Sequence, residues 1–134
     1  MKKYFALVAM MTTPFVVFAA SDAQTAVVEK IYQQASVNSD SLAILKKHAD
    51  ASFLKAIAVA ERKGAECMDS DPIWGNQDPQ TNAKVSFTRS GNQVTARFKQ
   101  YDQMTQVRYA LTCNGNQCAV SDVNKYKSQW SKCR

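Results

Sequence analysis

The feature that most constrains the fold of this chain is its set of four cysteines. Cys113 and Cys118 lie close together, whereas Cys67 and Cys133 have no close neighbour of their kind. A zinc site would need two close pairs, and a redox site would need the spacing C-x-x-C, so neither pattern is complete. An even number of cysteines is typical of disulfide-bonded proteins from oxidising compartments. We therefore expect two disulfide bonds.

The segment LTCNGNQCAV, residues 111–120, fits a short β-hairpin. Apolar residues alternate with polar or small ones on both sides of it, which is typical of half-buried strands. A turn at Asn114-Gly115 would pair Cys113 with Asn116 and leave the second cysteine without its partner. A turn at Gly115-Asn116 instead puts glycine at the first central position, which suits a type II′ turn.

This second turn predicts the register of the whole hairpin. It pairs Cys113 with Cys118, Leu111 with Val120, and Tyr109 with Asp122, so that the apolar residues share one face. Opposed α-carbons in such a pair are close enough for a somewhat strained disulfide. A Cys113–Cys118 bond is therefore expected, and Cys67–Cys133 follows by elimination.

The first 24 residues have the layout of a secretory signal peptide, with two lysines, an apolar stretch and small residues at the end. The apolar stretch is shorter than the roughly 20 residues that a spanning helix needs, and no later segment is apolar enough to span a bilayer. We expect a signal peptide over residues 1–19, with cleavage after Ala20 as the alternative. Residues 20–134 then form one domain in the periplasm or outside the cell.

The balance of charges is weakly basic. Loss of residues 1–19 lowers the net charge from +6 to +4, because 15 basic and 11 acidic residues remain. The basic residues are scattered, whereas a nucleic-acid-binding protein would show a dense basic stripe with interleaved aromatic residues. The bias fits an acidic partner, an anionic envelope surface or plain solubility. No specific binding of nucleic acid is expected.

The first part of the mature chain has helical periodicity. Apolar residues recur at helical spacing over residues 23–38 and again over 41–63, where Gly64 is a stop signal. Asp50 is expected to begin a new helix and to split the second segment near His48. Each helical segment has one apolar face and needs a surface to pack on.

After residue 84 the period changes to two. Val85 and Phe87 indicate one strand, RSGNQ a turn, and residues 94–98 the next strand, ahead of the hairpin. We predict an α+β fold, in which two or three N-terminal helices pack on the concave face of a curved antiparallel sheet of about four strands.

Two motifs resemble a known family. The chain reads DSDPIWGNQD at residues 69–78, between the helices and the strands, and CAVSDV at 118–123 in the last strand. Together with the order of elements, they resemble a family of small exported bacterial domains of unknown function, whose fold is similar to nuclear transport factor 2. In that family an acidic-proline loop ends in Gln-Asp, and the last strand often reads Trp-x-Ile-x-Asp-Ile. Cys118 replaces that tryptophan here, and the tail over residues 124–134 is a further departure.

The resemblance implies a cystatin-like, cone-shaped α+β fold and an exported protein. It implies no reaction, because this fold hosts enzymes and plain binding proteins alike.

Residues suited to catalysis are few. His48 is the only histidine, and no serine lies in a nucleophile elbow, so a catalytic triad has little support. The acidic residues of 69–78 do not fit an EF-hand, because Ile73 and Trp74 occupy its fifth and sixth positions. These carboxylates are expected to cap turns. We expect no metal and no cofactor.

The candidate binding residues come from the loop around Trp74 and from the basic tail. Trp74 either plugs the open end of the sheet or projects as a binding anchor. If Cys133 is bonded to Cys67, the tail lies near this loop, and an aromatic patch rimmed by lysines results. The candidate set is Ile73, Trp74, Lys125, Tyr126, Lys127 and Trp130, with Lys132 as a further rim residue.

These residues favour a non-enzymatic binding protein of the cell envelope, which engages a protein or a small acidic ligand. One version is an immunity or inhibitor protein against an envelope-acting enzyme. The alternative is a small hydrolase or isomerase that uses a carboxylate in the cone pocket. An enzyme would place a carboxylate inside a cavity with another polar group, whereas a binder would leave the cavity small and expose aromatic residues. The carboxylates to follow are Asp69, Asp78, Asp102 and Asp122.

Overall fold

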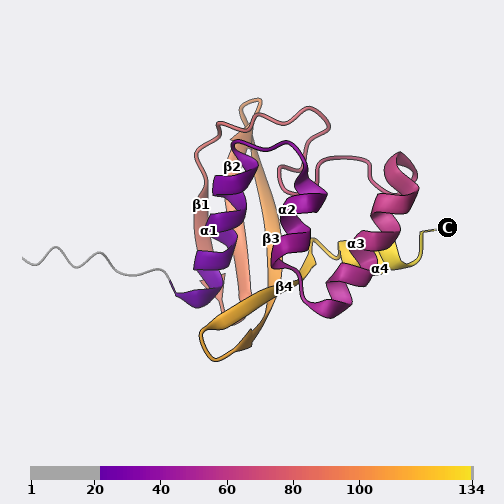
Figure 1. Cartoon of the computed structure of the whole chain (residues 1–134). Coiled ribbons are helices and arrows are strands. Elements are labelled where there is room, and N and C mark those ends of the chain that lie inside the picture. Colours follow the sequence, from indigo (N-terminus) through magenta and orange to yellow (C-terminus); the bar gives the residue numbers. More distant parts are fainter. Residues whose placement is uncertain (1–21, 134) are drawn as a thin grey trace, which may run out of the picture.

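A computed structural model of the chain describes residues 22–133 (Figure 1). The elements are, in order, α1 (Ala23–Ala35), α2 (Ser41–His48), α3 (Ala51–Lys63), a 3₁₀ turn η1 (Gly64–Glu66), β1 (Ser86–Ser90), β2 (Gln93–Gln100), β3 (Gln103–Asn114), β4 (Gln117–Val123) and α4 (Tyr126–Ser131). The predicted fold class is confirmed, because helices precede a four-stranded antiparallel sheet. The signal peptide predicted for residues 1–19 lies outside the described residues.

An aspartate begins each of the first three helices. The side chains of Asp22, Asp40 and Asp50 accept hydrogen bonds of 2.7, 3.1 and 2.9 Å from the backbone N–H groups three residues further on. Such N-caps satisfy donors that have no partner within the helix. The predicted split of residues 41–63 at Asp50 is confirmed. Helix α1 ends three residues earlier than predicted, and the exposed Val37 that follows packs on nothing.

The sheet has the strand order β1-β2-β3-β4, and all pairs are antiparallel. Strand β3 is long enough to change partners along its length. It pairs with β2 up to Ala110 and with β4 from Tyr109 onward, so Tyr109 and Ala110 have partners on both sides. A register shift between Ala110 and Leu111 marks the change, and a bulge of this kind bends a strand. Helices α1 and α2 lie on the same side of the sheet (Figure 1).

The register predicted for the hairpin is confirmed near the turn and wrong beyond it. Cys113 lies opposite Cys118, and Gly115 has the positive φ, 62°, that a type II′ turn requires at this position. Tyr109, however, pairs with Val123 and not with Asp122. The register shift after Ala110 adds one residue to β4, and the alternation of side chains alone does not reveal it.

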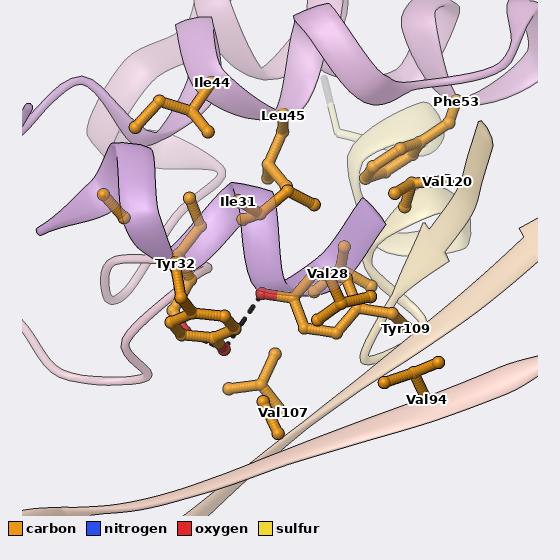
Figure 2. Close-up of a cluster of buried hydrophobic side chains, with 14 of the residues drawn as sticks. Val28, Ile31, Tyr32, Ile44, Leu45, Phe53, Val94, Val107, Tyr109 and Val120 are labelled. Atoms are coloured by element: carbon orange, nitrogen blue, oxygen red, sulfur yellow. Dashed lines mark hydrogen bonds between the residues drawn. The ribbon is translucent and has the colours of Figure 1, made fainter. Parts of the chain in front are cut away.

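The core lies between the helices and the sheet (Figure 2). Its centre is a pair of buried tyrosines from α1 and β3. The Tyr109 hydroxyl donates to the Tyr32 hydroxyl over 3.0 Å, and the Tyr32 hydroxyl donates to the Ile73 carbonyl over 2.8 Å. Burial raises the pKa of both phenols, so both are neutral donors at physiological pH.

The C-terminal helix α4 was not predicted. With six residues it is too short to show helical periodicity in the sequence. It packs against α3, where the Trp130 ring stacks on Phe53 with centroids 5.8 Å apart. The Cys67–Cys133 disulfide joins the end of this helix to the segment after α3, with α-carbons 5.9 Å apart.

Candidate functional site

Both disulfides are present with the predicted pairing. Cys67 is bonded to Cys133, and Cys113 to Cys118, and no cysteine of the described residues is free. Stable disulfides of this kind belong to an oxidising compartment. Among residues 22–133, no helix has the length and apolar character needed to cross a bilayer.

Trp74 and Ile73 are core residues and not exposed anchors. Trp74 is 2% exposed and Ile73 is 0% exposed. The Trp74 ring meets Tyr32 and Phe98 edge to face, with centroids 5.1 and 5.2 Å apart. Of the two roles considered for Trp74, the structure shows the plugging role, because the Trp74 ring fills space between α1 and the sheet. The loop around it follows Asp71, whose carboxylate accepts from the N–H groups of both residues.

The predicted aromatic patch is also not formed. Trp130 is 1% exposed and stacks between Phe53 and the half-buried Tyr126. Its ring partners differ from those of Trp74, so the two tryptophans contribute to different parts of one hydrophobic core and to no shared surface patch. The pairing of Cys67 with Cys133 does bring the tail to the linker, but α4 presents its aromatic face inward. The aromatic residues of this region therefore stabilise the fold and offer no exposed anchor.

The predicted basic residues of the tail do not lie together on one surface. Lys125 is exposed and lies on the opposite side of the sheet from the helices, as described below. Lys127 is half-buried, and its backbone N–H donates to the Asp122 carboxylate over 2.9 Å. Lys132 is exposed at the end of the chain. Only Lys125 thus lines a hollow together with other charged side chains.

Of the carboxylates of residues 69–78, Asp71 acts as a turn cap, as expected. Asp71 binds two backbone N–H groups with one oxygen and the Ser41 hydroxyl, 2.6 Å away, with the other. Asp69 lines a small cleft of 120 Å³ beside Cys67. Within residues 22–133, no group of three or more histidine, cysteine or acidic side chains is placed to hold a metal ion. His48 is half-buried, and its Nε2 lies 2.9 Å from the Gln34 amide oxygen.

Side chains fill the middle of the space between the helices and the sheet, and a hollow of about 340 Å³ lies at its edge, between α1 and residues 81–87. Tyr32, Tyr109, Trp74 and Phe98 occupy the centre of this space, and every buried polar side-chain atom of the described residues has a hydrogen-bond partner. The Tyr32 and Tyr109 hydroxyls use each other and a backbone carbonyl. This interior offers no unpaired polar group to a substrate.

The opposite face of the sheet, here called the basic sheet face, is exposed. We define it by Arg97 and Lys99 of β2 and by Met104, Gln106 and Arg108 of β3, which alternate with buried residues. Arg97 lies opposite Gln106, and Lys99 lies opposite Met104. With its oxygen toward Arg97, the Gln106 amide accepts two hydrogen bonds of 3.1 Å from the guanidinium. Met104 is 58% exposed, so this face combines cations with an apolar side chain.

A hollow of about 310 Å³, here called the outer-face groove, lies at one end of the basic sheet face. It forms where β3 changes partners. Ala110 lies opposite both Gln93 of β2 and Asp122 of β4. A methyl group between two longer side chains leaves a depression. The groove is lined by Gln93, Arg108, Ala110, Asp122, Asn124 and Lys125.

Two cations and one carboxylate line this groove. The ion pairs among the described residues lie on the helices and at the end of β1, and neither Arg108 nor Lys125 takes part in one. One oxygen of Asp122 accepts from the N–H groups of Val123 and Lys127, over 2.8 and 2.9 Å. The charge of the carboxylate is thus partly compensated by backbone dipoles, and the net charge of the groove is +1 (two cations and one anion).

Three cations of this surface, Arg97, Lys99 and Arg108, were missed from the sequence, whereas Lys125 and Asp122 of the groove were among the residues that it indicated. Arg97, Lys99 and Arg108 are not adjacent in the chain, so they form no basic run. Their signal is alternation: each lies next to a buried apolar residue within a strand, as in RFK at 97–99. Alternation places such residues on one face of a sheet. The register of β2 against β3 places Arg108 on the same face of the sheet as Arg97 and Lys99, and this register is known only from the structure.

Comparison with known proteins identifies the fold and no function. No protein-family model and no curated protein matches this chain. The chain is similar to a crystal structure of a protein of unknown function from Bacteroides thetaiotaomicron, with a TM-score of 0.56 and 19% identity. The similarity covers 75% of this chain and 88% of that one. At this identity the likeness shows a shared fold alone.

Proposed function

We propose that this protein is an exported, non-enzymatic binding protein of the cell envelope, and that its basic sheet face binds an acidic protein. One observation carries the proposal: the face opposite the helices is uncovered and presents Arg97, Lys99 and Arg108, with the exposed Met104 opposite Lys99. Cations next to an exposed apolar side chain suit a protein interface, because charges steer association and the apolar group supplies contact area.

The setting supports an envelope protein. Two disulfides stabilise the domain in an oxidising compartment, and the sequence begins with the layout of a signal peptide. The chain shares its fold with a bacterial protein of unknown function, and its motifs at residues 69–78 and 118–123 resemble those of exported domains similar to nuclear transport factor 2. The specific version that we propose is an immunity or inhibitor protein, which occludes an acidic, envelope-acting enzyme.

The alternative of a hydrolase or isomerase has less support. Its carboxylate would need a place inside the cone, where Tyr32, Tyr109 and Trp74 leave no unpaired polar group. Asp122 does line a hollow with another charged group, but that groove lies on the outer face of the sheet. We therefore assign this carboxylate to binding.

The test compares two charge reversals of equal size. Immobilised protein is incubated with envelope extract from the producing cells, at low and at high salt. The face variant is Arg97→Glu with Lys99→Glu. The matched control is Lys30→Glu with Lys55→Glu, which changes exposed residues of α1 and α3 by the same net charge.

We expect wild type and control to capture the same acidic protein in a salt-dependent way, and the face variant to lose it. A captured enzyme should lose activity when wild-type protein is added. Equal capture by the two variants would contradict the basic sheet face as the binding surface. Circular dichroism checks that each variant is folded.

A further inference from the structure

The outer-face groove differs from the rest of the basic sheet face, because one of its donors, the Asn124 side-chain amide, is held in place. The Asn124 N–H donates to the Arg108 carbonyl over 2.9 Å, and the Asn124 side-chain oxygen accepts from the Arg108 N–H over 2.8 Å. These two bonds attach the segment after β4 to β3. They leave the side-chain NH₂ of Asn124 without a protein partner among the described residues.

The backbone at the rim of the groove adopts an uncommon conformation. Asn124 and Lys125 have φ values of 48° and 64°, both in the left-handed region. Asparagine tolerates this region, whereas a lysine there is strained. The Lys125 side chain thereby lies at the groove, on the same face as the Arg108 guanidinium.

The donors match a carboxylate. A guanidinium binds a carboxylate through two parallel N–H groups, and an ammonium adds a point charge. Arg108 and Lys125 supply these groups, and the side-chain amides of Asn124 and Gln93 are further donors. The volume of 310 Å³ lies at the lower end for ligand sites and is ample for one side chain.

The charge of the groove selects among anions. With Arg108, Lys125 and Asp122 its net charge is +1, which one carboxylate neutralises. A phosphate group carries about −1.5 to −2 charges at neutral pH. It would place that charge beside the Asp122 carboxylate, whose second oxygen has no hydrogen-bond partner within residues 22–133. Repulsion of like charges therefore disfavours phosphate relative to carboxylate.

We infer that the outer-face groove binds one aspartate or glutamate side chain of the acidic partner. This inference rests on the proposed function and adds the anchor point of the interface. The remaining charges of the basic sheet face steer the partner, whereas Arg108, Lys125 and the hollow above Ala110 recognise a single carboxylate.

The test uses a small probe, so that it does not depend on finding the partner. The probe is N-acetylglutamate N-methylamide, and its neutral counterpart is the same compound made from glutamine. Binding is followed through the backbone amide signals of the isotope-labelled mature protein by NMR. Inorganic phosphate is titrated in parallel at the same ionic strength.

We expect saturable shifts for the glutamate probe, centred on Arg108, Asn124 and Lys125, and none for the glutamine compound. Arg108→Gln should weaken binding by about tenfold or more. Ala110→Leu should do so too, because it fills the hollow without changing charge. Lys55→Gln on α3 removes the same charge as Arg108→Gln and should leave the affinity unchanged.

Three results would overturn the inference: no saturable shift at the groove, equal weakening by Lys55→Gln, or tighter binding of phosphate than of the glutamate probe. Failure of the groove is distinguishable from failure of the proposed function. If Arg97→Glu with Lys99→Glu abolishes partner capture while the probe does not bind, the interface stands and the anchor is wrong. If the probe binds but capture is equal in both charge-reversed variants, the basic sheet face is wrong.

Discussion

Along β2, side chains alternate between two environments. Val94, Ala96 and Phe98 lie buried against the helices, whereas Arg97 and Lys99 between and after them are exposed on the other side. The buried face is determined by packing, since each side chain there must fill a defined space. The exposed face has no such constraint, and threonine or glutamine would serve the strand equally well. The cations there are therefore free to serve recognition, and the predictions below test this division.

The largest effect is expected from the buried face. Trp74→Ala should lower the free energy of unfolding by about 3–5 kcal/mol, because it leaves a cavity between Tyr32 and Phe98. Met104→Ala, on the basic sheet face, should change it by less than about 1 kcal/mol. Urea unfolding with the disulfides intact measures both. Similar losses for the two variants would mean that the faces are not energetically distinct.

The disulfide that closes the longer loop should contribute more to the free energy of unfolding. Replacing Cys67 and Cys133 by alanine opens a loop of 66 residues and should cost about 4 kcal/mol by the chain-entropy model. Replacing Cys113 and Cys118 opens a loop of five residues and should cost about 2 kcal/mol. Thermal and urea unfolding of the two double variants measure the two losses of stability. A larger loss from the hairpin pair would show that strain or residual structure, and not loop length, governs their contributions.

The predictable part of the structure comes from local rules. Caps such as Asp50, the Gly115 turn and the change of period after residue 84 each act within a few residues, so the sequence alone indicated them. The hairpin register was correct for the same reason, as far as the turn controls it. The fold class follows from the order of these elements.

What could not be predicted depends on contacts between distant residues. The sequence left open whether Trp74 is a buried plug or an exposed anchor, and only the packing of Tyr32 and Phe98 around its ring shows that it is buried. The outer-face groove needs the register shift after Ala110, which brings Asn124 opposite Arg108. No pattern within one strand reveals which residues of three strands lie side by side.

A moderate effect is expected where the helices meet the sheet. Asp50 caps α3, and its other carboxylate oxygen accepts from the Thr112 hydroxyl of β3 over 3.2 Å. Partial burial opposes ionisation, but hydrogen bonds from Phe53, Ser52 and Thr112 outweigh it and lower the pKa of Asp50. Asp50→Ala should therefore cost about 1 kcal/mol at pH 7.

The pH dependence separates the charge of Asp50 from its capping role. A carboxyl whose pKa is lowered by folding stabilises the folded state at pH values above its ordinary pKa of about 4. This stabilisation is lost as the pH falls through the pKa that the group has in the folded state. Asp50→Asn keeps a capping oxygen and should lose little stability at low pH, but it should lack this part of the acid-induced decrease. Urea unfolding between pH 2 and 7, about the range of carboxyl titration, compares the variants. If the free energy of unfolding of Asp50→Asn fell with pH as steeply as that of wild type, Asp50 would be excluded as a source of the acid-induced decrease.

The smallest effect is expected from two neighbours that point to opposite faces. Arg108→Thr removes an exposed cation that makes no ion pair within the described residues, so the free energy of unfolding should change by no more than about 0.5 kcal/mol. Tyr109→Phe removes only a hydroxyl, yet it should cost about 1 kcal/mol, because the buried Tyr32 hydroxyl loses its donor. The smaller chemical change thus has the larger effect on stability. If Arg108→Thr proved the more destabilising, the guanidinium would be part of the fold, and its assignment to recognition would fail.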